Sequence, residues 1–227
     1  MNDNKSAHMA DEYDKKIKGT IPNYDLLHSE TINLVKSINP NPKIWLDTGC
    51  GTGNFLLLAS RTFSATEFAL ADPSNPMIEI AKEKLSEFGA IKVKTIEKAS
   101  TQDITIEDNC FDVITAIQAH HYLDRDGRKT ATENCYRMLK TGGVFVAFEN
   151  IRPLTDEGVR IGKNRWKKFQ MESGKTEEEA QKHVDRFGIE FFPITIIEYI
   201  ELLRKTGFSS VELFWYSYMQ AGFYAIK

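Results

Sequence analysis

The sequence is poor in cysteine and has no long apolar run. Its 227 residues include three cysteines, Cys50, Cys110 and Cys135, whose spacing does not fit a metal site. An odd number of widely separated cysteines favours reduced thiols over disulfides. No stretch approaches the roughly 20 consecutive apolar residues that a membrane-spanning helix requires. We therefore expect a cytoplasmic protein that holds no metal and does not enter a membrane.

The sequence also lacks a strong charge of either sign. A formal net charge of −3 offers no broad attraction for nucleic acid, so nucleic-acid binding is not expected. The densest basic cluster, residues 160–168, is interrupted by Trp166, and we interpret it as the solvated face of a helix. The first residues lack the charged-then-apolar pattern of an export signal. An apolar content of 41% over this length predicts one core and a single domain, residues 1–227.

The most informative segment is Ile44–Gly53, in which an apolar run leads into three glycines at alternate positions. An apolar, helix-like run follows at Phe55–Ala59. A glycine-rich turn between a strand and a helix lets the backbone approach a ligand and directs free N–H groups at it. The next strand-like segment ends in Asp72, nineteen residues after Gly53, where an acid that binds ribose hydroxyls is expected. These features predict a nucleoside-binding site.

The spacing of the glycines distinguishes between nucleoside cofactors. A dinucleotide fingerprint, G-x-G-x-x-G, would need a glycine where Asn54 stands, whereas the third glycine here is Gly53. An acid, Asp47, also stands two residues before Gly49. This combination resembles motif I of the class I S-adenosylmethionine-dependent methyltransferases.

The resemblance implies that S-adenosyl-L-methionine is the cofactor. In that family the glycine turn lies against the methionine end, the acid after the second strand binds the ribose, and residues after the second and third strands line the adenine pocket. Residues after the fourth strand lie beside the sulfonium. Carried over to this sequence, the implied contacts are Tyr24, Asp47, Gly49, Cys50, Gly51, Gly53, Asp72, Pro73, Met77, Ser100, Thr101 and Gln118. For Met77 and Tyr24, simple core packing is the alternative. Tyr24 is preferred to Tyr13 in the same region.

Strands and helices alternate through the first two thirds of the chain. The expected strands are Lys43–Asp47, Thr66–Asp72, Ile91–Glu97, Phe111–Ile117 and Val144–Glu149, the last entered through a turn at residues 141–143. This alternation predicts a doubly wound, mostly parallel α/β sheet. Val211–Tyr216 and Tyr218–Ile226 follow as an antiparallel pair. The family resemblance implies the same ending, in a seven-stranded, Rossmann-like sheet with an antiparallel last strand.

Signals for a helix precede the last two strands. Thr195 and Glu198 form a capping box, and Gly207 is placed to end that helix.

Two regions lie outside the alternation. Residues 1–38 are expected to form an N-terminal helical cap, with a helix over 23–38 and a polar first twenty residues that become ordered only with a ligand or partner. Residues 152–192 are charged, with helical stretches at 158–172 and 176–187. An insertion after the fifth strand would cover the ligand crevice, so we interpret it as a substrate lid; a homodimer surface is the alternative.

Methyl transfer depends mainly on alignment, and it needs a base only if the acceptor must lose a proton. His121, beside His120, and Glu149, at the end of the fifth strand, are the candidates for such a role; packed, hydrogen-bonded structural residues are the alternative.

The resemblance implies a methyltransferase that acts on a small molecule. Residues 21–25, the segment from Gly207 to Trp215 and the segment from Ala221 to Lys227 also resemble the carboxy-S-adenosylmethionine synthase group. In that group an arginine near the site binds the extra carboxylate, and Arg160, Arg186 or Arg204 would be the source here. A non-catalytic regulator that binds S-adenosylmethionine is the third alternative.

Overall fold

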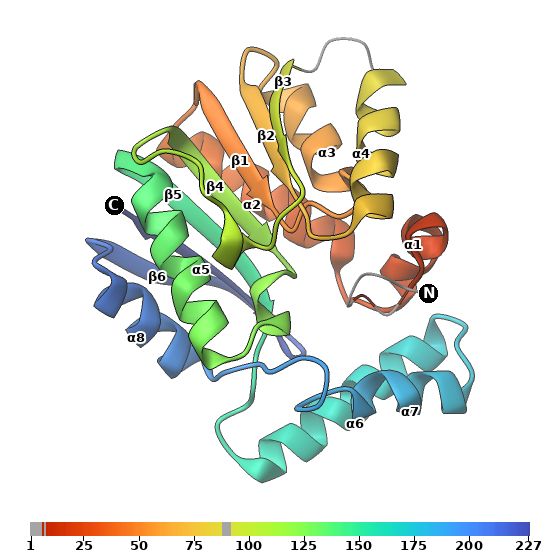
Figure 1. Cartoon of the computed structure of the whole chain (residues 1–227). Coiled ribbons are helices and arrows are strands. Elements are labelled where there is room, and N and C mark those ends of the chain that lie inside the picture. Colours follow the sequence, from red (N-terminus) through yellow and green to blue (C-terminus); the bar gives the residue numbers. More distant parts are fainter. Residues whose placement is uncertain (1–5, 7, 88–91) are drawn as a thin grey trace.

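A single seven-stranded sheet organises the protein. The computed structural model describes residue 6 and residues 8–87 and 92–227, so Ile91 of the third expected strand lies outside the described residues (Figure 1). The sheet order is β3-β2-β1-β4-β5-β7-β6; β7 runs antiparallel to β5 and β6, and the other described pairings are parallel. The strands are β1 Ile44–Thr48, β2 Glu67–Ala71, β3 Lys92–Glu97, β4 Phe111–Ile117, β5 Leu139–Asn150, β6 Ser210–Ser217 and β7 Gln220–Ile226. The predicted fold class is confirmed.

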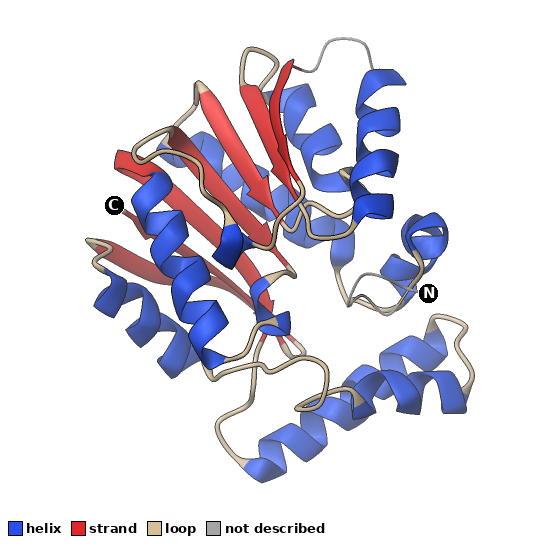
Figure 2. Cartoon of the chain, viewed as in Figure 1, coloured by secondary structure: helices blue, strands red, loops and turns tan. Residues whose placement is uncertain are grey.

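Helices cover both faces of the sheet (Figure 2). They are α1 Ala10–Lys16, α2 Tyr24–Ile38, α3 Asn54–Thr62, α4 Asn75–Glu87, α5 Arg125–Met138, α6 Asp156–Glu172, α7 Glu177–Asp185 and α8 Ile196–Thr206, with short 3₁₀ turns η1 Ile17–Gly19, η2 Thr101–Asp103 and η3 His120–Tyr122. Helices α2, α3 and α4 pack on one face and α5 and α8 on the other. Helices α6 and α7 lie beyond the ends of the strands (Figure 1).

The central strands are apolar because they are buried on both faces. Trp45 packs in the cluster under α3, and its neighbour Leu46 packs in the cluster under α5 and α8, since successive side chains of a strand point to opposite faces. Both side chains are fully buried. This double burial explains why β1 and β4 appear in the sequence as short apolar runs rather than alternating patterns.

The capping box and the glycine after it form as predicted. Thr195 accepts a hydrogen bond from the N–H of Glu198, and the Glu198 carboxylate accepts one from the N–H of Thr195. Gly207 then ends α8 in the left-handed conformation, at φ +116°.

The turn at residues 141–143 differs from the expectation. Strand β5 already begins at Leu139, and its pairing with β4 shifts between Phe111 and Val113. Gly142 adopts φ +77° within this irregularity, and its N–H donates to the carbonyl of Lys227 at 2.8 Å. Lys227, the residue after β7, also donates its N–H to the carbonyl of Gly143 at 3.0 Å. Gly142 and Gly143 therefore lie in an irregular, bulge-like part of one continuous strand.

In the N-terminal region, residues 10–19 form α1 and η1. Asp14 accepts hydrogen bonds from Thr52 at 2.6 Å, from Asn54 at 2.7 Å and from Lys84 at 2.6 Å. These contacts join α1 to the turn after β1 and to α4. They come from residues distant in sequence, which is why the polar composition of this segment gave no sign of them.

The turn after β1 depends on glycine. Gly49, Gly51 and Gly53 have φ of +70°, +54° and +76°, which disfavour any other residue. A Cβ atom built on Gly49 would lie 2.4 Å from the Cβ of Ala119, in the segment after β4. The absence of a side chain at position 49 therefore lets the loops at the ends of β1 and β4 meet.

A buried hydrogen-bond chain joins the same two strands. The indole N–H of Trp45 donates to Thr115 Oγ1 at 3.0 Å, and that hydroxyl donates to Asp47 Oδ1 at 2.6 Å. Asp47 and Thr115 are register partners in β1 and β4. Burial raises the pKa of Asp47 to about 7, although the hydrogen bond from Thr115 favours the ionised form.

Gly49→Ala is expected to destabilise the protein by about 3 kcal/mol, the sum of the left-handed backbone penalty and the clash with Ala119. Gly142→Ala is the matched control. Its φ is similarly positive, but a Cβ built there meets no described atom within 4 Å, so only the backbone penalty of about 1 kcal/mol applies.

Urea unfolding of both variants, and of the double variant Gly49→Ala/Ala119→Gly, measures the two contributions. The double variant should regain most of the unfolding free energy that the clash with Ala119 costs. Equal losses at the two glycines would show that the contact with Ala119 is unimportant.

Asp47→Asn is expected to change how stability depends on pH. Between the ordinary pKa of an aspartate in the unfolded chain and a pH of about 7, Asp47 is protonated in the native protein and ionised in the unfolded chain. The free energy of unfolding that Asp47 contributes is therefore present in full at low pH and is lost as pH rises towards about 7. The loss reaches on the order of 4 kcal/mol, at about 1.4 kcal/mol per pH unit. Asparagine still accepts from Thr115 but cannot ionise.

The difference in unfolding free energy between variant and wild type, measured from about pH 5 to about pH 8, should therefore grow in favour of the variant and level off above about pH 7. A difference that does not depend on pH would contradict the assignment.

Candidate active site

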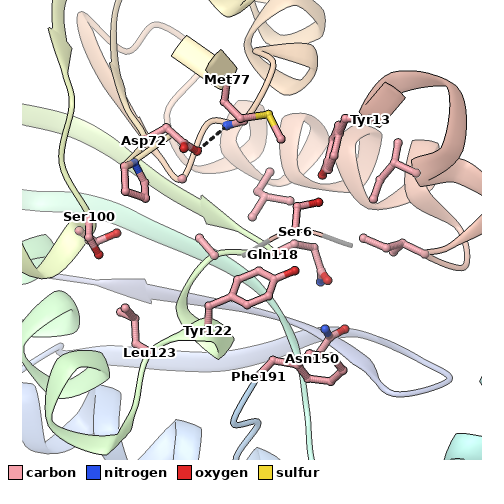
Figure 3. Close-up of a pocket in the computed structure, with 18 of the residues that line it drawn as sticks. Ser6, Tyr13, Asp72, Met77, Ser100, Gln118, Tyr122, Leu123, Asn150 and Phe191 are labelled. Carbon is pink, nitrogen blue, oxygen red and sulfur yellow. Dashed lines mark hydrogen bonds between the residues drawn. The ribbon is translucent and has the colours of Figure 1, made fainter. Parts of the chain in front are cut away.

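A cavity of about 300 Å³ opens at the carboxyl ends of β1, β2, β4 and β5. This is the edge at which open α/β sheets bind ligands. Figure 3 shows Gln118 and Tyr122 in its middle, between Asp72 and Met77 on one side and Asn150 and Phe191 on the other. The cavity thus connects the predicted nucleoside site with a region formed by residues after β5.

The nucleoside side is built by the glycine turn and the end of β2. Asp72 is buried, its Oδ2 accepts the N–H of Gly51 at 2.9 Å, and its Oδ1 accepts the N–H of Ser74 at 2.9 Å. A Cβ atom built on Gly51 would meet no described atom within 4 Å, so the backbone there is open to a ligand. The hydrogen bonds fix the carboxylate at the wall of the cavity, where it can accept from ribose hydroxyls.

Gln118 is the most strained polar residue of the site. It follows β4 with φ +56°, a conformation that costs a residue other than glycine about 1–3 kcal/mol. Both amide atoms of its side chain are buried, and no described residue hydrogen-bonds to either. Leaving such groups unpaired costs about 1–3 kcal/mol more. Strain and unpaired polar atoms at a cavity wall indicate a ligand-binding residue.

A smaller cavity of about 30 Å³ lies beneath the glycine turn. Tyr24, Asp47 and Cys50 line it, together with Gly49, Gly51 and Gln118, which also line the main cavity. Burial raises the pKa of the Cys50 thiol well above its usual value, so this cysteine fills the turn rather than acting as a reactive thiolate.

The structure brings most of the predicted cofactor residues to one place. The main cavity is lined by Gly49, Gly51, Asp72, Pro73, Met77, Ser100, Thr101 and Gln118. Within the described part of the chain, Gly53 lines neither cavity; it caps α3 and packs on Ala81 of α4. An open glycine backbone, a fixed carboxylate and an unpaired amide together fit S-adenosylmethionine.

His121 and Glu149 form a buried pair with each other. Glu149 accepts the backbone N–H groups of His120 at 3.1 Å and His121 at 2.8 Å, and its Oε2 lies 2.8 Å from His121 Nδ1. Neither side chain is among the described residues that line the two cavities. The pair ties η3 to the end of β5, and so holds Tyr122 and Asn150, which do line the main cavity. The geometry favours the structural alternative.

The far side of the main cavity is an aromatic end, made of Tyr122, Trp166, His183 and Phe191. The sequence pattern did not point to His183 or Phe191. Trp166, which interrupts the basic cluster at 160–168, is 1% exposed, and its indole N–H donates to the carbonyl of Thr20 at 2.7 Å. Contacts across 146 positions leave no periodic signal in a sequence. Tyr13 lines both cavities, whereas Tyr24 lines only the smaller one.

No described helix is long and apolar enough to cross a membrane. No three His, Cys, Asp or Glu residues among those described gather as metal ligands do.

Known proteins resemble the chain in sequence and in fold. Residues 46–143 match a family model described as a methyltransferase domain. A carboxy-S-adenosyl-L-methionine synthase of Alteromonas mediterranea is 26% identical over 223 residues, covering 96% of this chain and 90% of that protein. A ubiquinone/menaquinone biosynthesis C-methyltransferase of Haemophilus ducreyi is 31% identical over 113 residues, covering 49% of this chain and 42% of that protein.

Solved structures agree with the observed fold. A SAM-dependent methyltransferase from Thermotoga maritima superposes with a TM-score of 0.64 and 18% identity, over 97% of each chain. Sequence matches, fold and the geometry around Asp72 and Gly51 converge: residues 46–143 match a methyltransferase domain, the whole chain is similar in sequence to carboxy-S-adenosylmethionine synthases and in fold to S-adenosylmethionine-dependent methyltransferases, and the cofactor is S-adenosyl-L-methionine.

Proposed function

We propose that the enzyme transfers the methyl group of S-adenosylmethionine to a small molecule bound at the aromatic end of the main cavity. The observation that carries this proposal is the continuity of the cavity, which runs from Gly51 and Asp72 past Gln118 to Trp166 and Phe191. A site that only sensed the cofactor would not need this second, aromatic compartment. S-adenosylmethionine supplies a methyl group that is already activated on a positively charged sulfur.

The residues of the chain contribute alignment and exclusion of water. Asp72 and the backbone of the glycine turn would hold the nucleoside, and the amide of Gln118 would bind a polar group at the junction of the two ends. Tyr13 and Trp166 close the cavity from the N-terminal region and from the 152–192 insertion, which we propose as a substrate lid. Alignment in a closed site can supply several powers of ten in rate.

Native mass spectrometry of the purified protein, followed by methylation assays on a panel of small acceptors, tests the proposal. A bound mass equal to S-adenosylmethionine or its demethylated product, together with methyl transfer to at least one acceptor, supports it. Cofactor binding without transfer to any acceptor class would favour a regulator.

A second function, carboxy-S-adenosylmethionine synthesis, is favoured by relatives that match along nearly the whole chain. The position of one arginine also supports it. Arg160 pairs with Glu157 at the exposed surface and Arg204 is exposed on α8, whereas the side chain of Arg186 is only 11% exposed and lies against Tyr122 of the cavity. A bound cofactor heavier by one carboxylate would favour this function over simple methyl transfer.

Asp72→Ala is expected to weaken the binding of S-adenosylhomocysteine by about 1.5–3 kcal/mol, because the variant loses charge-assisted hydrogen bonds to the ribose. Isothermal titration measures the change. Asp156→Ala removes an exposed acid of the same charge and should leave the affinity unchanged. A folded Asp72→Ala protein with wild-type affinity would contradict the ribose assignment.

Gln118→Gly is expected to separate stability from binding. Glycine accepts φ +56° without strain, and no hydrogen bond to a described residue is lost, so the free energy of unfolding should rise by about 1 kcal/mol. Binding of S-adenosylhomocysteine or acceptor should weaken by about tenfold, the loss of about one hydrogen bond.

Asn109→Gly is the control for a left-handed residue outside the site. Asn109 has a similar φ of +55° and lies at the exposed surface, where its side chain accepts a hydrogen bond from Lys227 Nζ at 3.0 Å. Relief of strain and loss of this exposed bond offset each other, so stability should change little and binding not at all, measured by urea unfolding and titration. A Gln118→Gly protein that binds both ligands normally would remove Gln118 from the site.

A further inference from the structure

His183, on α7, is a buried polar residue at the aromatic end of the cavity. It is 9% exposed and lines the cavity, yet both ring nitrogens are buried without a hydrogen-bond partner among the described residues. Each unpaired buried group costs about 1–3 kcal/mol. A histidine with two unpaired ring nitrogens beside a cavity is placed to bind a ligand.

Aromatic rings surround the imidazole. The ring centroid of Trp166 lies 5.0 Å from that of His183, nearly perpendicular at 79°, and the centroid of Phe191 lies 6.2 Å away. Tyr122 meets Phe191 edge to face at 6.4 Å and 86°. These rings make a wall on which a planar molecule can pack, with His183 as its polar group.

The charges that act most strongly on His183 are cationic. Burial lowers its pKa well below the usual value, and Lys175, Arg186, His8 and His121 lower it further. Burial also lowers the pKa of His8 to about 4, so His8 is neutral near pH 7. Burial lowers the pKa of Lys175 to about 8, which leaves it mostly charged at pH 7, and Arg186 is charged throughout. Lys175 Nζ donates to Gln170 at 2.6 Å, and Arg186 Nε donates to Glu190 at 2.7 Å, which holds both cations in place.

A neutral imidazole in this setting favours one class of ligand. It carries one N–H, and the positive potential of the two cations opposes any further positive charge in the cavity. An oxygen that carries negative charge is attracted by the potential and accepts the N–H.

We propose that the aromatic end binds a planar acceptor through an anionic oxygen, a phenolate or a carboxylate, and that His183 donates its ring N–H to that oxygen. This inference rests on the proposed function, for which it names the class of acceptor.

4-Nitrophenol is a suitable probe because its phenolate absorbs visible light and its neutral form does not. Addition of the wild-type protein at slightly acidic pH should increase the visible band, since the site favours the ionised form. His183→Leu should weaken phenolate binding about tenfold or more. His183→Gln restores an N–H donor and should recover most of the affinity.

Two further ligands distinguish the sources of the anionic oxygen. 4-Nitroanisole has the same ring without an ionisable oxygen and should bind weakly and equally to all three proteins. Benzoate, in competition with 4-nitrophenolate, tests the carboxylate: tighter binding of benzoate that depends on His183 identifies a carboxylate acceptor, and tighter binding of the phenolate identifies a phenol.

Titration of the same samples with S-adenosylhomocysteine separates this inference from the proposed function. If all three proteins bind S-adenosylhomocysteine but His183→Leu holds 4-nitrophenolate as tightly as wild type, the inference is overturned and the function stands. Failure of the wild type to enhance the visible band, with and without S-adenosylhomocysteine, also overturns it. Phenolate binding that depends on His183 in a protein unable to bind S-adenosylhomocysteine would support the subsite and contradict the function.

Discussion

The contact between Gly49 and Ala119 is the constraint on which the site depends. With no side chain at position 49, the loop after β1 can lie directly against the loop after β4. This places Gln118 beside the glycine turn, where its backbone is held in the left-handed region and its side chain faces both cavities. Asp72 then reaches the same turn from β2 through the N–H of Gly51. One missing methyl group thus allows three strand ends to form a single binding surface.

Two groups of hydrogen bonds support that surface from either side. On the N-terminal side, Asp14 joins α1 to Thr52, Asn54 and Lys84, which fixes the helix over the glycine turn. On the other side, Glu149 binds η3 to the end of β5. In both groups a carboxylate stabilises the architecture by accepting several donors at once, whereas Asp72 lies at the wall of the main cavity.

Local sequence predicts the central sheet and much of the cavity wall, and physical causes explain which parts it could not predict. The glycine turn, the spacing to Asp72 and the apolar runs of β1 and β4 are properties of short segments. They predicted the sheet, and most of the residues that they named line one cavity. The aromatic end could not be predicted, because Trp166, His183 and Phe191 come together only through packing of the 152–192 insertion. The helix α1 left no signal in the sequence for the same reason, since Asp14 finds its partners in the turn after β1, on α3 and on α4. The bulge at Gly142 depends on a carbonyl of the last residue, Lys227.

Two segments, the N-terminal region and the 152–192 insertion, cover the main cavity, and each is attached to a different part of the protein. Asp14 attaches the N-terminal one to the cofactor loop, whereas α6 continues from β5 and meets the first at the hydrogen bond between Trp166 and Thr20. Trp166 and Thr20 thus join the two segments above the cavity, although 146 positions separate them in the chain. Covering the aromatic end therefore requires the insertion and the N-terminal region to fold against each other.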